Sequence, residues 1–204
     1  MSPGPDYNRE KGTVFNELFK GKEFEIFLDG LWLPLPTLVK AHTKSTLEEL
    51  CTLEDETLEH ISEHGDDLLG DNGGDGSGRH AKFRNSKSDN QNLILGGFRL
   101  ISLKCHCGCG LIVYKEKSLG PETEVPYFLI PGKETRDTMQ AIVTKMKPEM
   151  VACNDQDNPL IITVLGLDIK LFCKIKTSQI DRKMMDQICG CGGAICLLCN
   201  ATRS

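Results

Sequence analysis

Apolar residues alternate with other residues on both sides of the dipeptide Asp29-Gly30. An Asp-Gly pair between two alternating runs is typical of a β-hairpin with a two-residue turn. The pattern predicts that Leu28 pairs with Leu31 and that the alternating apolar side chains share one face. These side chains are Phe24, Ile26, Leu28, Leu31, Leu33 and Leu35. Because an isolated hairpin is only marginally stable in water, that face needs a cover. We favour cover by the rest of the protein over cover by a partner.

Two segments beside this hairpin have helical patterns. Residues 12–20 are compatible with one short helix. Residues 45–63 begin with Ser and Thr three residues before Glu, which is the pattern of a capping box, and they carry a partial apolar stripe. The stripe consists of Leu47, Leu50, Leu58 and Ile61. The second segment is either a solvated amphipathic helix or a recognition helix that folds in the groove of a partner, and both interpretations stay open.

Charge is distributed unevenly along the chain. Residues 46–78 contain eleven acidic side chains and no Lys or Arg, whereas the rest of the chain has 24 basic and 18 acidic residues. We expect this acidic arm to be solvated and mobile, joined to a mildly basic body. The net negative charge of the whole chain argues against a protein that binds nucleic acid strongly. Residues 65–92 are rich in Gly, Asp, Ser and Asn and are predicted to be a disordered linker.

The body of the protein begins near Leu93 and contains the same pattern twice. Each copy has a strand, a tight turn, a second strand, a helical segment and a terminal cysteine, in residues 93–154 and again in 155–204. We interpret the copies as a tandem duplication of a small ββα unit that needs a metal or a partner to be stable. The predicted fold is therefore α+β: tandem ββα zinc-binding units, a disordered acidic linker, and an N-terminal hairpin and helix segment in residues 1–64.

The ten cysteines carry the main chemical signal. The first residues lack a secretory leader pattern, and no apolar run reaches the roughly 18 residues of a membrane helix. We therefore expect a reducing, intracellular location, where cysteines are more often zinc ligands or free thiols than disulfides. Seven of the ten fall in two short clusters, and zinc takes four tetrahedral N or S ligands. The predicted zinc ligands are Cys105, Cys107, Cys109, Cys153, Cys196 and Cys199.

Two arrangements of these ligands stay open. In one, a single zinc bridges the two units through the hairpin cysteines and the Cys196/Cys199 pair. In the other, Cys189 and Cys191 join that pair around a local zinc, while the hairpin cluster binds its own zinc together with Cys153. Glycines between the hairpin cysteines allow the tight turn that both arrangements require.

His106 lies next to Cys105 and raises the question of a Cys–His nucleophile. Adjacent residues of a strand point to opposite faces, and no third group that would orient the histidine is apparent. We therefore expect no catalytic site, and keep His106 as an alternative zinc ligand. The other histidines lie in polar segments and are predicted to be solvated: His42, His60, His64 and His80. Two cysteines in apolar patterns, Cys51 and Cys173, are predicted to be packing residues.

The C-terminal segment resembles the zinc domain of the papillomavirus early-protein-seven oncoproteins. That domain has a short strand, a helix led by Asp, Ile and Arg, a glycine, and then an apolar residue followed by C-x-x-C. The matching residues are Ile180, Asp181, Arg182, Gly193, Ile195, Cys196 and Cys199. The segment FRLISLKCHCGCGLIVY resembles the start of the same domain, and STLEELCTLE is similar to the first conserved region of the family. The doubling of the zinc unit resembles the sister early-protein-six family, whose members have two zinc modules.

The resemblance implies a non-enzymatic viral protein that binds host cell-cycle regulators in the host nucleus and cytoplasm, with zinc as cofactor. Retinoblastoma-type pocket proteins are candidate partners, although the family's L-x-C-x-E peptide is absent from this chain. Because ordinary members pair two zinc domains as a homodimer, the duplication predicts a monomer, and no membrane contact is expected. The alternatives are an adaptor that recruits a host ubiquitin ligase, a thiol enzyme, and a DNA-binding transactivator with a basic face that includes Lys170, Lys174 and Lys176.

Overall fold

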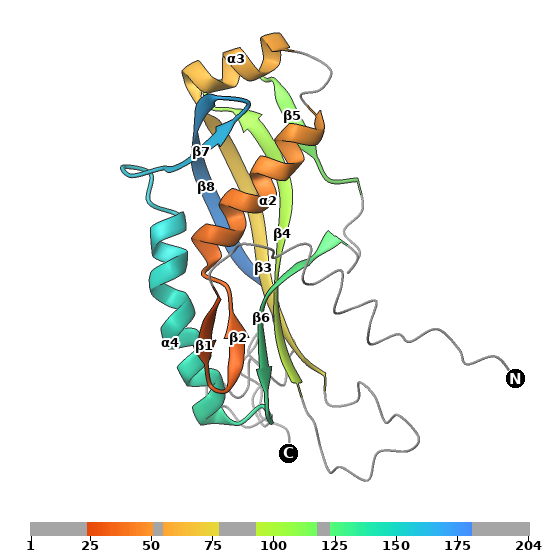
Figure 1. The fold of residues 1–204 in the computed structure, drawn as a ribbon, viewed down its shortest axis with the longest axis vertical. Helices are drawn as coiled ribbons and strands as arrows, with labels where there is room; N and C mark the ends of the chain where they lie inside the picture. The colour runs from red at the N-terminus through yellow and green to blue at the C-terminus, as the bar shows by residue number, and fades with distance from the viewer. Residues whose placement is uncertain (1–23, 51–54, 78–92, 118–122, 181–204) are drawn as a thin grey trace, which may run out of the picture.

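Strands with buried residues at every second position form one curled sheet in the structure, a computed structural model that describes residues 24–50, 55–77, 93–117 and 123–180 (Figure 1). In chain order the elements are β1 (Glu25–Phe27), β2 (Gly30–Trp32), α2 (Leu35–Leu50), α3 (Asp55–His64), β3 (Asp66–Ser77), β4 (Leu93–Cys105), β5 (Ile112–Lys115), β6 (Val125–Pro131), α4 (Arg136–Cys153), β7 (Leu160–Val164) and β8 (Leu167–Ile180). The coarse prediction of an α+β fold is confirmed.

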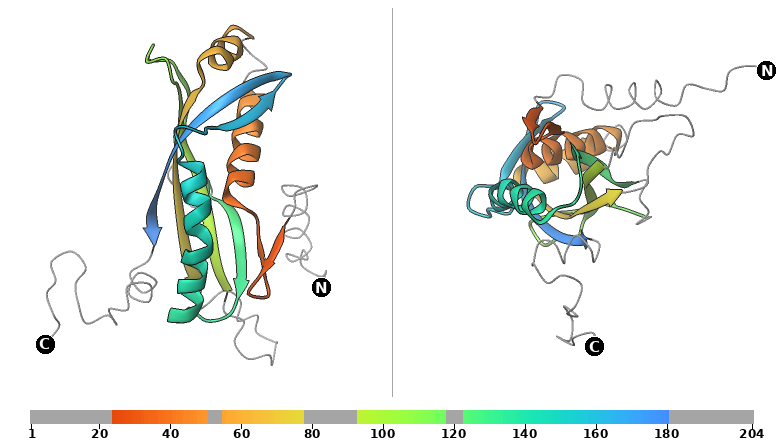
Figure 2. Two further views of the ribbon diagram at one scale, coloured as in Figure 1. Left: turned by 90° about the vertical axis from the view of Figure 1, so that its left-hand side faces the viewer. Right: turned by 90° about the horizontal axis from the view of Figure 1, so that it is seen from below.

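The strands follow the order β1-β2-β6-β4-β3-β8-β7, and β5 pairs with β4 beyond the end of β6. β3 runs parallel to β8, whereas the other described pairs are antiparallel. α2 and α4 pack against each other within the curl of the sheet, and α3 lies across one end (Figure 1 and Figure 2). The buried core between these layers includes Trp32, Phe98, Ile142 and Leu171. In the described part of the chain, no helix is long and apolar enough to cross a membrane.

The N-terminal hairpin forms, but its turn is shifted by one residue from the prediction. Leu28 and Asp29 make the turn, with φ angles of 49° and 59°, and Phe27 pairs with Gly30. Ile26 and Leu31 still share one face, but Leu28 lies in the turn and Leu35 in α2, so the six alternating side chains do not form one continuous surface. Trp32, on the opposite face of β2 from Leu31, points into the core, where its ring stacks on Phe128 with centroids 4.8 Å apart. Burial of the large indole favours this face of β2 as the core face over the face that carries the smaller Leu31. Pairing of β2 with β6 attaches the hairpin to the rest of the sheet.

α4 anchors the hairpin and the start of α2 through one carboxylate. Glu149 accepts hydrogen bonds from the indole Nε1 of Trp32 and from the backbone N–H of Leu35, each at 2.8 Å. The second bond satisfies one of the N–H groups that the first turn of α2 leaves without a helical partner. Burial raises the pKa of Glu149, while these two bonds favour its charged form. Lys145, one turn earlier in α4, lies 5.3 Å above the Trp32 ring.

The helical prediction for residues 45–63 corresponds to parts of two helices. α2 begins earlier than expected, and α3 covers the second half of the segment. Three residues of the predicted stripe, Leu47, Leu58 and Ile61, are buried in the core, whereas Leu50 is exposed. The stripe thus packs within this chain and not in the groove of a partner. The helix predicted in residues 12–20 lies outside the described residues.

The prediction of a disordered linker is wrong for residues 66–77, which form β3 at the centre of the sheet. Aromatic rings of neighbouring strands fill the space beside one glycine of β3 and one of β4. A Cβ at Gly70 would lie 2.6 Å from the Phe98 ring, and a Cβ at Gly96 of β4 would lie 2.0 Å from the Phe128 ring. Asp66 and Asp71 are buried, so this part of the acidic arm is not solvated. Residues 78–92 lie outside the described residues.

Both predicted strand pairs of the body are present. β4 and β5 flank the cysteine turn, and β7 and β8 flank a turn at Leu165 and Gly166. An unpredicted strand, β6, stands between β5 and α4 and pairs with β4 on one edge and β2 on the other. Residues 181–204, which include the second predicted helix and the C-terminal cysteines, lie outside the described residues.

The loop after α4 completes the edge of β8 with side-chain amides. Asn154 donates to the Ile175 carbonyl at 3.0 Å and accepts from the Ile175 N–H at 2.7 Å.

We expect Asn154→Ala to lower the free energy of unfolding by about 1–3 kcal/mol, because it leaves both backbone groups of Ile175 without these partners. Urea denaturation checks this, with Asn158→Ala in the same loop as an exposed control. Equal losses in both variants would contradict the role of Asn154.

Candidate metal centre

Three cysteines converge where β4 ends. Cys105 is the last residue of β4, and Cys107 and Cys109 follow in the turn that leads to β5. Gly108 and Gly110 have φ angles of 77° and 82°, a region that glycine enters without a steric penalty. The alternation of cysteine and glycine therefore lets the chain curl so tightly that its sulfur atoms face one point.

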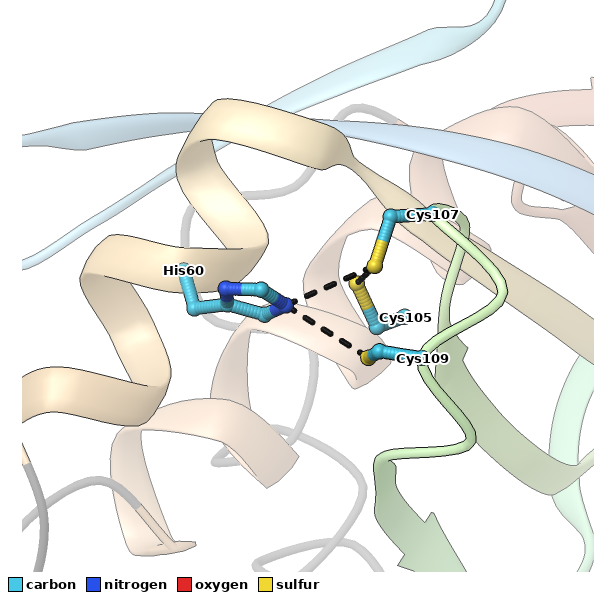
Figure 3. A group of neighbouring side chains, drawn as sticks. All are labelled: His60, Cys105, Cys107 and Cys109. Carbon is cyan, nitrogen blue, oxygen red and sulfur yellow. Dashed lines mark hydrogen bonds between the residues drawn. The ribbon is translucent and has the colours of Figure 1, made fainter.

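A histidine from α3 completes the cluster. His60 Nε2 lies 3.5 Å from the sulfur of Cys107 and 3.5 Å from that of Cys109 (Figure 3). The sulfurs of Cys105 and Cys107 are 3.1 Å apart, and the four candidate ligand atoms all lie within 4.8 Å of one another. Around a tetrahedral zinc, with Zn–S of about 2.3 Å and Zn–N of about 2.0 Å, ligand atoms stand roughly 3.5–3.8 Å apart. The four side chains therefore fit a zinc ion after small rotations.

Backbone contacts hold this turn against the corner between α3 and β3. The His106 N–H donates to the Gly65 carbonyl at 2.9 Å, and the Cys105 N–H donates to the Leu111 carbonyl at 3.0 Å. Gly65 ends α3 with a φ of 81°, and its N–H bonds to the Ile61 carbonyl. α3 and the cysteine turn are thus positioned together, which sets the separation between His60 and the sulfurs.

The thiols differ in their environments. Burial raises the pKa of Cys105 to about 12. Hydrogen bonding from Cys105 and Cys109 lowers the pKa of Cys107, which is exposed, so Cys107 loses its proton before Cys105 does. Zinc binds thiolates and displaces their protons. The cluster therefore combines an exposed thiol of lowered pKa that can meet an incoming ion with a buried sulfur that closes the site.

His106 points away from the cysteines. Its Nδ1 lies 2.9 Å from the Asp67 carboxylate, and its ring stacks on Phe172 with centroids 3.9 Å apart. Asp67 is the orienting group that the sequence did not reveal. In the described part of the chain, however, no hydrogen bond joins His106 to a cysteine, so the geometry does not assemble a Cys–His nucleophile. His106 is not part of the metal cluster either.

Asp66 is a buried acidic residue beside the cluster. It pairs with Cys105 across β3 and β4, and its side chain has no solvent exposure. Neither carboxylate oxygen has a hydrogen-bond partner among the described residues. Burial, with a smaller contribution from the charge of Asp67, raises the pKa of Asp66 to about 7. The composition of its segment gave no sign of this environment.

The predicted ligands fall into three groups. Cys105, Cys107 and Cys109 come together as a cluster. Cys153 lies at the end of α4, buried near Cys173 and not in that cluster, and burial raises the pKa of both thiols to about 12. The C-terminal cysteines lie outside the described residues: Cys189, Cys191, Cys196 and Cys199.

His60 is the member that sequence reasoning missed. It was assigned to solvent because its segment is polar, and zinc-ligand spacing rules do not connect a helix to a cysteine turn 45 residues later. Its side chain reaches the sulfurs because the buried Leu58 and Ile61 fix the orientation of α3.

The comparisons with known proteins add no relative: no protein-family model matches the chain, and no curated protein matches its sequence.

Proposed function

We propose that this is a zinc-binding, non-enzymatic protein in which one Cys3His centre joins α3 to the turn between β4 and β5. The observation that carries the proposal is the convergence of His60 with Cys105, Cys107 and Cys109. Borderline-soft N and S ligands favour zinc, and four protein ligands leave no open position for a substrate or an activated water. Such a closed site has a structural role.

The length of α3 explains why a metal would be needed here. The helix has 10 residues, which is too short for independent stability in water. Its buried apolar side chains are few, and the metal would add a link between the helix and the end of β4. Zinc binding in small domains contributes directly to the free energy of folding.

We also propose that the protein acts as an adaptor for host regulatory proteins, as its resemblance to the papillomavirus family implies. The support is the cysteine turn between two paired strands, together with the C-x-x-C near the C-terminus. A second zinc unit formed by Cys189, Cys191, Cys196 and Cys199 belongs to the same proposal. The closed His60 centre favours this arrangement over one zinc shared with the C-terminal pair, because its four ligands are already supplied.

Elemental analysis of zinc in the purified full chain tests the metal centre. We expect Cys107→Ser/Cys109→Ser to bind one zinc fewer per chain than the natural protein. His64→Ala is the matched control, because the His64 ring meets the His60 ring edge to face with centroids 4.7 Å apart but is outside the cluster, and this variant should keep all its zinc. Cys196→Ser/Cys199→Ser should keep the His60 zinc. A natural protein without zinc, or an unchanged count in the first variant, would refute the proposal.

A further inference from the structure

A row of aliphatic side chains crosses four strands on the outer face of the sheet. The register aligns Ile26 of β1 with Leu31 of β2, Leu31 with Leu129 of β6, and Leu129 with Leu95 of β4. Residues paired in register point to the same face. The next paired residues, Trp32 and Phe128, point into the core, so the row faces away from the core. We call these four residues the outer row.

The outer row is not fully covered. Ile26 is 75% exposed, and the three leucines are only partly buried. A shallow hollow beside them is lined by Phe24, Leu31, Pro126, Tyr127, Phe128 and Leu129. A contiguous apolar surface of this kind usually marks a contact with another segment or another molecule.

The sequence directly before β1 has an amphipathic pattern. Val14, Phe15, Leu18 and Phe19 follow the spacing that places apolar residues on one face of a helix. Residues 1–23 lie outside the described residues, and Phe24 is the first described residue. Only residues 21–23 therefore separate the end of segment 12–20 from Phe24, which lines the hollow beside the outer row. A helix of this length is not stable alone in water, so it also requires a surface to pack on.

We propose that segment 12–20 packs its apolar side chains over the outer row of the same chain. The four Cα–Cα steps from residue 20 to Phe24 span about 13 Å when extended, whereas β1 and β6 are two strand spacings, or about 10 Å, apart. The connection is long enough for the segment to fold back over β1 and β2 to Leu129. A short tether holds the segment at an effective concentration on the order of millimolar, which favours it over a free partner. This inference does not depend on the metal centre.

Site-specific photo-cross-linking tests the proposal in the full chain at low concentration. A benzophenone amino acid placed at Leu129 should cross-link within the monomer to the peptide that contains Phe15 and Phe19, as identified by mass spectrometry. The same group at Ile161, which is 52% exposed on β7 at the far edge of the sheet, is the control and should give no such product. Cross-linked dimers at position 129 would instead show that a second copy covers the row. Absence of any cross-link to the segment would also overturn the proposal.

Hydrogen exchange gives a second test without altering the sheet. Phe15→Asp/Phe19→Asp should speed amide exchange in β1 and β2 at least tenfold, because it removes the cover while all described residues stay natural. Asn16→Asp, on the polar side of the predicted helix, is the control and should exchange like the natural protein. Equal exchange in the natural protein and the double variant would refute packing of the segment on the row.

Discussion

Asp66→Asn is expected to raise the free energy of unfolding at pH 8 by as much as about 4 kcal/mol. The pKa of Asp66 is about 7 in the folded protein against 3.8 for an exposed carboxyl, and each unit of difference corresponds to about 1.4 kcal/mol. Between pH 4 and 7 the folded state keeps a proton that the unfolded state releases. Stability therefore falls as the pH rises through this window, and the penalty is complete above pH 7. Asparagine has no charge to bury and avoids the penalty.

The pH dependence of this gain is the decisive measurement. Urea denaturation of both zinc-saturated proteins at several pH values should give a difference of about 1 kcal/mol at pH 4.5 that grows to about 4 kcal/mol at pH 8. Asp168→Asn is the control, because Asp168 is exposed on β8 and Asn can still accept the hydrogen bond from Thr163. A gain that is the same at every pH, or a loss at pH 8, would show that Asp66 has a partner in the folded protein.

Gly30→Ala is expected to cost about 3 kcal/mol, because the added methyl group meets backbone and not a flexible side chain. Its Cβ would lie 2.3 Å from the Leu129 carbonyl oxygen and 2.7 Å from the Ile130 Cα. Relief of this clash requires β2 and β6 to move apart. The pairing of β2 with β6, which attaches the hairpin to the rest of the sheet, would then be lost first.

Trp32, the single tryptophan of the chain, reports directly on this pairing. It is fully buried in β2, so detachment of the hairpin should shift its emission to longer wavelength at lower urea than in the natural protein. Gly97→Ala is the matched control in β4, since the three atoms nearest to its Cβ all belong to the Glu124 side chain, the closest at 3.3 Å. If Gly30→Ala keeps the native emission and midpoint, β6 does not approach Gly30 as closely as described.

Local patterns identified several elements correctly. The Asp-Gly signal located the hairpin, the spacing of Leu47, Leu58 and Ile61 located buried helical positions, and the cysteine spacing located a turn with convergent sulfurs. These features depend on residues close in sequence. The face of the hairpin that meets the core was missed because it is decided by Trp32 stacking on Phe128, a contact across roughly 100 residues that no local pattern contains.

β3 and His60 were missed for a related reason. The composition of β3 is that of a linker, and its glycines are accommodated only because rings such as Phe98 from the neighbouring strand occupy the space beside them. His60 becomes a candidate ligand only when α3 is packed at the end of β4. In both cases the deciding partner comes from a distant segment, so composition and spacing could not reveal it.

The parallel pairing of β3 with β8 also has a consequence for the order of folding. Asp66 pairs with Leu171, so a loop of roughly 100 residues must close before the central strand gains its second neighbour. During synthesis β3 can pair with β4 long before β8 exists, and one edge of the growing sheet stays open meanwhile. An open edge is a template for aggregation, but glycine and aspartate are poor residues for intermolecular β-pairing. The composition that resembles a linker thus protects the nascent chain while its last strand is being made.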